Sequence, residues 1–131
     1  MKTDNKVELD SLSERVISAI FEVSNTLGGG FLEKVYQRAL ITELRLRGLG
    51  VTAEVAFKVS YKGQVVGEYF ADLLVEDVLV VELKCVERLT GEHAAQCLNY
   101  LRASGRKVCL LVNFYKPKVE WKRVVHGFPD F

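Results

Sequence analysis

The chain has 131 residues, of which 49% are hydrophobic and 27% are charged, a composition typical of one soluble globular domain. This length supports a single core without disulfide or metal staples, and the composition excludes a disordered chain. The formal net charge of +1 gives no long-range attraction toward nucleic acid or a membrane surface. Any contact of that kind must therefore come from a local patch.

The cysteines and the first residues indicate the compartment. Cys85, Cys97 and Cys109 form an odd set without C-x-x-C spacing, so we expect free thiols in a reducing environment. Residues 1–6 are polar and lack the apolar region of a signal peptide, and no run approaches the length of a membrane span. We therefore expect a cytoplasmic protein that has no membrane partner.

Two helices are predicted behind a polar N-terminal tail, residues 1–10. Ser11 and Glu14 fit a capping box, which predicts a helix that starts at Ser11 and ends at the glycines of residues 28–30. Apolar residues at helical spacing then predict a second helix over residues 31–47.

The middle of the chain predicts strands. Residues 51–61 and 64–66 are strand-like and are separated by a turn at residues 62–63. Residues 68–75 and the apolar run 78–81 form a second pair around a polar break. Together these segments predict an antiparallel meander.

The last third of the chain predicts a helix crossover followed by strands. A helix begins near Gly91 and ends at Gly105, and residues 107–112 form a nearly continuous apolar strand, which is typical of a central position. A helix between two strands implies that they pair in parallel. Residues 119–125 fit a last strand, and residues 126–131 are expected to form a tail.

Three charged residues, Asp72, Glu82 and Lys84, stand beside the apolar hairpin. Burying an acid and an amine there is costly unless they pair or hold a metal. Side chains alternate along a strand, so Glu82 and Lys84 share one face. A two-residue loop at residues 76–77 would put Asp72 and Glu82 on opposite faces, whereas an odd loop or a bulge would place them opposite each other. We predict the odd register, which brings two oxygen ligands within reach of one divalent cation.

These charges have a second interpretation. They also fit a surface ion-pair cluster on a half-exposed sheet, which would be purely structural. The basic residues of the C-terminal segment are similarly open to two interpretations, a solvated strand edge or a patch that follows phosphates. They are Lys116, Lys118, Lys122 and Arg123.

Two motifs carry a resemblance to a known family. The segment Gly30-Phe31-Leu32-Glu33-Lys34-Val35-Tyr36 spells the signature of the small GxxExxY family. Asp72 followed by Glu82-Leu83-Lys84 resembles the core motif of the PD-(D/E)xK nuclease superfamily, to which the GxxExxY family is assigned. The resemblance extends from about Leu12 to Phe114, and it departs at Ala71, where the superfamily's name has proline.

The resemblance implies an α/β (α+β) domain over residues 11–125 with a restriction-endonuclease-like core. Its mixed sheet would contain an antiparallel meander flanked by helices, in the order ααβββαβ. It also implies a Mg²⁺ site, in which Mn²⁺ can substitute. The implied metal ligands are Asp72, Glu82, Glu33 and, as a further oxygen, the carbonyl of Leu83. Lys84 would lie beside the attacking water, Gln96 would position substrate or Lys84, and Tyr36 and Tyr100 would support the site.

The leading hypothesis is a Mg²⁺-dependent nuclease that hydrolyses phosphodiester bonds in DNA or RNA. The alternative is a non-catalytic nucleic-acid-binding or regulatory module that retains the nuclease fold, because the chain is small and carries little excess positive charge. An interaction protein with purely structural charges is a third reading. A homodimer is also an expectation, although no sequence feature fixes an interface.

Overall fold

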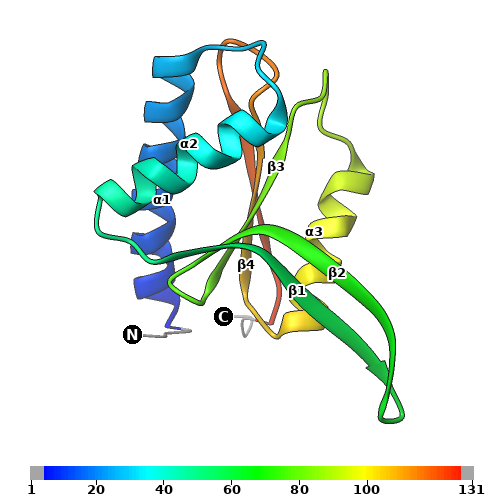
Figure 1. The fold of residues 1–131 in the computed structure, drawn as a ribbon. Helices are drawn as coiled ribbons and strands as arrows, with labels where there is room; N and C mark the ends of the chain where they lie inside the picture. The colour runs from blue at the N-terminus through cyan, green and yellow to red at the C-terminus, as the bar shows by residue number, and fades with distance from the viewer. Residues whose placement is uncertain (1–4, 128–131) are drawn as a thin grey trace.

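The computed structural model describes residues 5–127, and in this part of the chain three helices flank a five-stranded mixed sheet (Figure 1). The elements are α1 (Lys6–Leu27), α2 (Glu33–Leu46), β1 (Val51–Tyr61), β2 (Gln64–Val75), β3 (Leu79–Lys84), α3 (Gly91–Ser104), β4 (Val108–Asn113) and β5 (Glu120–Val125). The predicted order ααβββαβ matches the elements up to β4, and β5 follows where residues 119–125 were expected to fit a last strand. The predicted tail, residues 126–131, lies largely outside the described residues.

The predicted start of the first helix is wrong. Helix α1 already begins at Lys6, because the side-chain oxygen of Asn5 accepts two backbone N–H groups of the first turn, at 2.9 and 3.2 Å. Leu9 then packs into the core with no exposed surface. Ser11 lies inside the helix, so the capping box does not form, and only the start of the predicted tail over residues 1–10 precedes the helix.

The sheet separates two layers of helices. Helices α1 and α2 cover one face and α3 covers the other (Figure 1). Alternate residues of β3 and β4 point into the two cores, and β4 is buried along its whole length. Strand β4 pairs in parallel with β3, so its predicted central position and parallel pairing are confirmed. None of the described helices is long and apolar enough to span a membrane.

The β2–β3 hairpin has the predicted odd register. Its ladder includes Leu73 opposite Val81, and the connection covers residues 76–78. The same register places Asp72 opposite Glu82, one position beyond the last paired residues. The two strands part at this position, and β3 continues beside β4 alone.

Strands β1 and β2 form a long antiparallel ribbon that extends away from the body of the molecule (Figure 1). Its outer half exposes apolar side chains, among them Tyr61, Val65 and Val66 at 62%, 58% and 62%. The opposite end of the ribbon runs into the core and carries Asp72.

Candidate metal centre

Asp72 lies where β2 and β3 part, and its position follows from the backbone groups that this divergence leaves unpaired. The Asp72 carboxylate Oδ2 accepts the backbone N–H of Leu83 at 2.7 Å. The Gln37 side chain, buried on α2, donates through Nε2 to the Asp72 carbonyl at 3.2 Å. Both backbone groups are thereby satisfied, as buried groups must be. The result is a carboxylate held at the opening between two strands.

Glu82 is a buried carboxylate with one oxygen still available. Its side chain is on the α3 side of the sheet and the residue is 4% exposed. Oε2 accepts the Tyr100 hydroxyl at 3.2 Å and lies 3.3 Å from the ammonium Nζ of Lys84. Within residues 5–127, Oε1 is buried and has no hydrogen-bond partner. An unpaired buried carboxylate oxygen is costly, so it indicates a ligand that is not part of the chain.

The electrostatics of the pair favour a bound cation or a proton. Burial, and then the Asp72 charge, raise the pKa of Glu82 to about 7, although the Lys84 ammonium acts in the opposite direction. The pKa of Tyr100 is also raised, first by burial and then by the charge of Glu82, so its hydroxyl remains a donor. Two neighbouring carboxylates are unfavourable when both are ionised, and a dication between them would remove that penalty.

Glu33 approaches this pair from the start of α2, where its side chain is exposed. Partial burial raises the pKa of Glu33, the Asp72 carboxylate raises it further, and Lys84 and Lys34 lower it. The interactions with Asp72 and Lys84 show that Glu33 faces the acidic pair. Within residues 5–127, however, no three His, Cys, Asp or Glu side chains gather closely enough to hold an ion. The preformed part of the site is therefore the pair Asp72 and Glu82, and Glu33 lies at its rim.

Tyr36 positions Glu33 indirectly, by fixing the loop that leads into α2. Its hydroxyl donates to the Gly28 carbonyl at 2.6 Å and accepts the Phe31 N–H at 3.2 Å. Its ring stacks on Phe114 with a centroid distance of 4.6 Å. Gly30 in the same loop has φ 101°, a conformation that side chains rarely adopt. Gly30 and Tyr36 therefore both fix the path of the chain from α1 into α2.

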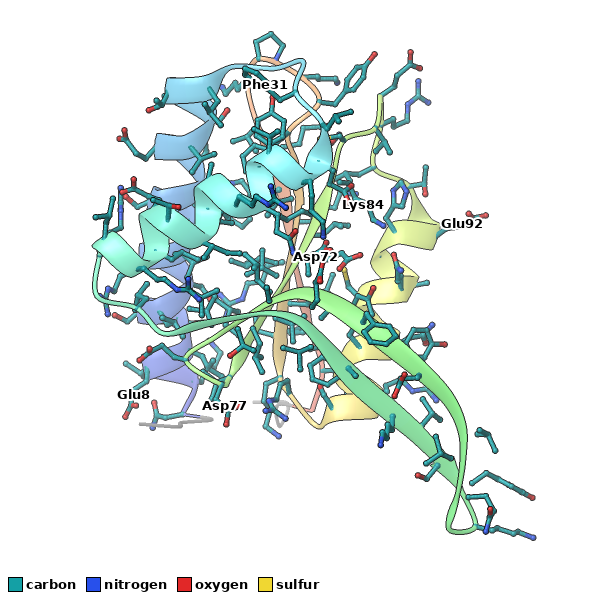
Figure 2. The ribbon with its side chains drawn as sticks, in the orientation of Figure 1. Glu8, Phe31, Asp72, Asp77, Lys84 and Glu92 are labelled. Atoms are coloured by element: carbon teal, nitrogen blue, oxygen red, sulfur yellow. The ribbon has the colours of Figure 1, made fainter. Side chains whose placement is uncertain are left out.

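The structure brings together most of the residues that the sequence predicted for this site. Asp72, Glu82, Lys84 and Tyr100 lie together around the opening between β2 and β3. Figure 2 labels two of them, Asp72 and Lys84. Leu83 joins them through its N–H, which binds Asp72, rather than through a described contact of its carbonyl. Gln96 lies on α3 one turn before Tyr100 and is half-buried, and its side chain has no hydrogen bond among the described residues.

Gln37 was missed by the sequence prediction. It is four residues after Glu33, so the two polar side chains share one side of α2. That spacing was a usable signal, because a glutamine on the sheet-facing side of a helix needs a partner in the sheet.

A family model described as the PD-(D/E)XK nuclease superfamily matches residues 10–124, and the chain therefore belongs to this superfamily. No curated protein matches the chain.

Two solved structures are similar in fold. The crystal structure of SSO0001 matches with a TM-score of 0.57 and 17% identity, over 73% of this chain and 50% of the other. An alkaline exonuclease (LHK-Exo) from Laribacter hongkongensis matches with a TM-score of 0.49 and 18% identity, over 82% of this chain and 76% of the other. The chain thus spans half the length of SSO0001, and identities this low show the fold alone. The predicted fold class, an α+β domain with a restriction-endonuclease-like core, is confirmed.

Proposed function

We propose that this protein is a divalent-cation-dependent nuclease that hydrolyses phosphodiester bonds of nucleic acid, with Mg²⁺ as the ion and Mn²⁺ as a substitute. One observation carries the proposal: the buried Oε1 of Glu82 has no partner among the described residues, in a carboxyl group that interacts with the Asp72 carboxylate. The donor set fits the ion, because Mg²⁺ prefers oxygen ligands and binds through one or two carboxylates plus substrate phosphate.

In this proposal the chain supplies the ligands for the ion, and a water molecule is the nucleophile. Asp72 and Glu82 would hold the cation, with the Leu83 carbonyl as a further oxygen and Glu33 reaching it through water. Once bound, the cation would lower the pKa of a water molecule and neutralise charge on the phosphate. Tyr100 would keep Glu82 in place, since it donates to Oε2 at 3.2 Å.

Lys84 is the proposed catalytic residue beside the ligands. Its ammonium lies 3.3 Å from Glu82 Oε2 and on the same face of β3, so it is already held next to the acidic pair. There it can donate a hydrogen bond to the attacking water or to the phosphate oxygen on which charge develops. Gln96, one turn before Tyr100 on α3, would position substrate or Lys84.

We also infer that the chain is close to the GxxExxY family. The support is the segment of residues 30–36, in which a glycine with positive φ, an acid that faces the site and a loop-anchoring tyrosine each have a structural role. We propose nucleic acid as the partner, a cytoplasmic location, and a homodimer as the working state.

A cleavage assay tests the proposed function. The purified protein is incubated with labelled single- and double-stranded DNA and RNA in Mg²⁺, Mn²⁺ or EDTA. We expect metal-dependent cleavage that falls roughly 100-fold or more in Lys84→Ala, as for the loss of one donor that stabilises the transition state. Lys58→Ala, at an exposed lysine on the β1–β2 ribbon, is the matched control and should cleave like the wild type.

Cleavage that is absent with all four substrates, or that persists in Lys84→Ala, would overturn the proposal. Metal-dependent binding without turnover would instead support the alternative, a non-catalytic module that retains the nuclease fold.

A further inference from the structure

A hollow of about 660 Å³ lies beside the acidic pair, on the side of Glu33. It is lined by Gly30, Phe31, Leu32, Glu33, Cys85 and Tyr115. Its volume is within the range of sites that bind small molecules or parts of larger ones. Glu33 connects the hollow to the acidic pair, because its carboxylate interacts with Asp72 and Lys84.

Two aromatic rings on separate loops are exposed at this hollow. Phe31 is 49% exposed and Tyr115 is 48% exposed, whereas their neighbours Tyr36 and Phe114 are buried. Figure 2 shows Phe31 at the end of the molecule where the chain passes from α1 to α2. Aromatic side chains exposed in this way offer flat apolar faces, which are the surfaces on which the bases of unpaired nucleotides stack.

The walls of the hollow are fixed by the fold. The Phe31 ring rests edge-on against Tyr36 at a centroid distance of 6.2 Å, and Tyr36 in turn stacks on Phe114. The Tyr115 N–H donates to Asn113 Oδ1 at 3.2 Å, and the same buried asparagine binds the chain just after β3 at 3.0 and 2.7 Å. The Phe31 ring and the Tyr115 backbone are therefore held by contacts that do not depend on a ligand, so binding there would require little ordering of the two loops.

The two loops are also in direct contact. A Cβ added at Gly29 would lie 3.0 Å from the Tyr115 carbonyl oxygen, which explains the glycine at that position. Ser24 Oγ donates to the Pro117 carbonyl at 3.4 Å. The loop after Tyr115 then exposes Lys116 and Lys118, which place positive charge next to the aromatic wall. Sequence alone left these lysines open between a solvated edge and a phosphate patch, and their place beside Tyr115 favours the patch.

We propose that this hollow stacks the base of an unpaired nucleotide, so that the substrate is single-stranded nucleic acid. The inference rests on the proposed function, because it places the phosphate next to that base at Asp72 and Glu82. Bases inside a duplex are stacked on each other and do not present a face to a protein side chain, whereas an unpaired base does. Lysines beside the rings would track the adjoining phosphates.

Binding in EDTA tests the inference separately from catalysis. Fluorescence anisotropy with labelled mixed-sequence oligonucleotides compares single strands of DNA and RNA with the duplex of the same sequence. We expect the wild type to bind a single strand more tightly than the duplex, and Tyr115→Ala to weaken single-strand binding roughly 5- to 150-fold, the range for loss of one stacked base. Tyr115→Trp should retain binding. The matched control is Tyr61→Ala at the ribbon tip, a tyrosine that is 62% exposed and should bind like the wild type.

A second variant and a crosslink keep the test independent of folding. Phe31→Ala should weaken single-strand binding in the same direction. A 5-bromouridine oligonucleotide irradiated on the wild type should crosslink at Phe31 or Tyr115. Equal or tighter duplex binding, unchanged binding by Tyr115→Ala, or a crosslink confined to other residues would overturn the inference.

The outcomes separate this inference from the proposed function. Single-strand binding that depends on Tyr115 without any cleavage would support base stacking in the hollow and overturn the proposed nuclease activity. If Tyr115→Ala cleaves duplex at the wild-type rate, the result would overturn base stacking in the hollow but still support the proposed nuclease activity.

Discussion

At the scale of single residues, Glu82 determines how the site depends on pH. Burial, and then the Asp72 charge, raise its pKa from an ordinary 4.5 to about 7. Between these two values the folded protein holds a proton that the unfolded chain has released. The contribution of Glu82 to the free energy of unfolding is therefore largest below pH 4.5 and is lost as the pH rises through about 7.

Glu82→Gln should remove this dependence. The amide cannot ionise, so in EDTA the variant should unfold with a higher free energy than the wild type at pH 8, by roughly 1 to 3 kcal/mol, and with little difference at pH 4.5. Urea denaturation at the two pH values measures this. Glu87→Gln, at an exposed glutamate just after β3, is the control and should follow the wild type. A Glu82→Gln protein that is less stable than the wild type at pH 8 would contradict the burial argument.

The placement of the two acidic residues could be predicted from the sequence, but the contacts that support them could not. The alternation of side chains along a strand and the odd connection over residues 76–78 were enough to place Asp72 opposite Glu82. The backbone groups that Gln37 and Asn113 bind could not be assigned, because those groups become unpaired only where strands part or end. That information lies in the tertiary structure and not in the local pattern.

At the scale of elements, the loop before α2 sets the position of Glu33. Gly30 has φ 101°, which a residue with a side chain adopts only under strain. Gly30→Ala should lower the free energy of unfolding by roughly 1 to 3 kcal/mol. Gly67→Ala is the matched control, since Gly67 has no positive φ and an added Cβ would meet nothing within 4 Å. Chemical denaturation of both variants checks this, and equal effects of the two substitutions would contradict it.

Gln37 links α2 to the end of the β2–β3 ladder. Gln37→Ala leaves the Asp72 carbonyl without its described donor, and it should lower the free energy of unfolding by roughly 1 to 3 kcal/mol. Arg38→Ala, one residue on and exposed, serves as the control in the same urea titration. Hydrogen exchange should also become faster at the Leu83 amide, which binds Asp72. A Gln37→Ala protein that matches Arg38→Ala in both measurements would show that the link is dispensable.

The elements themselves were predicted well because most of them have strong boundaries. Glycines end α1 and α3, and the turn at residues 62–63 joins β1 to β2. The start of α1 was predicted too late for a physical reason. A serine followed three residues later by a glutamate also occurs inside helices, and the capping group that formed belongs to Asn5. Asn5 lies close to the polar N-terminus of the chain, where no apolar pattern indicates that a helix begins.

At the scale of the whole molecule, the fold brings one helix from each face of the sheet to the same opening. Helices α2 and α3 lie on opposite sides of the sheet (Figure 1). Helix α2 contributes Gln37 and Glu33, and α3 contributes Tyr100. The acidic pair lies between them, where β2 leaves β3. With a net charge of only +1, attraction of a polyanion must depend on local groups such as Lys84, Lys116 and Lys118.

The central claim is that Asp72 and Glu82 together hold a divalent cation, and a crystal soaked in Mn²⁺ tests it most directly. The account predicts an anomalous density peak at coordination distance, about 2.0 to 2.3 Å, from a carboxylate oxygen of each residue. The peak should be absent from crystals of Asp72→Asn soaked in the same way. Crystals of the wild type that show no peak at either carboxylate, or a peak only elsewhere on the molecule, would contradict the account.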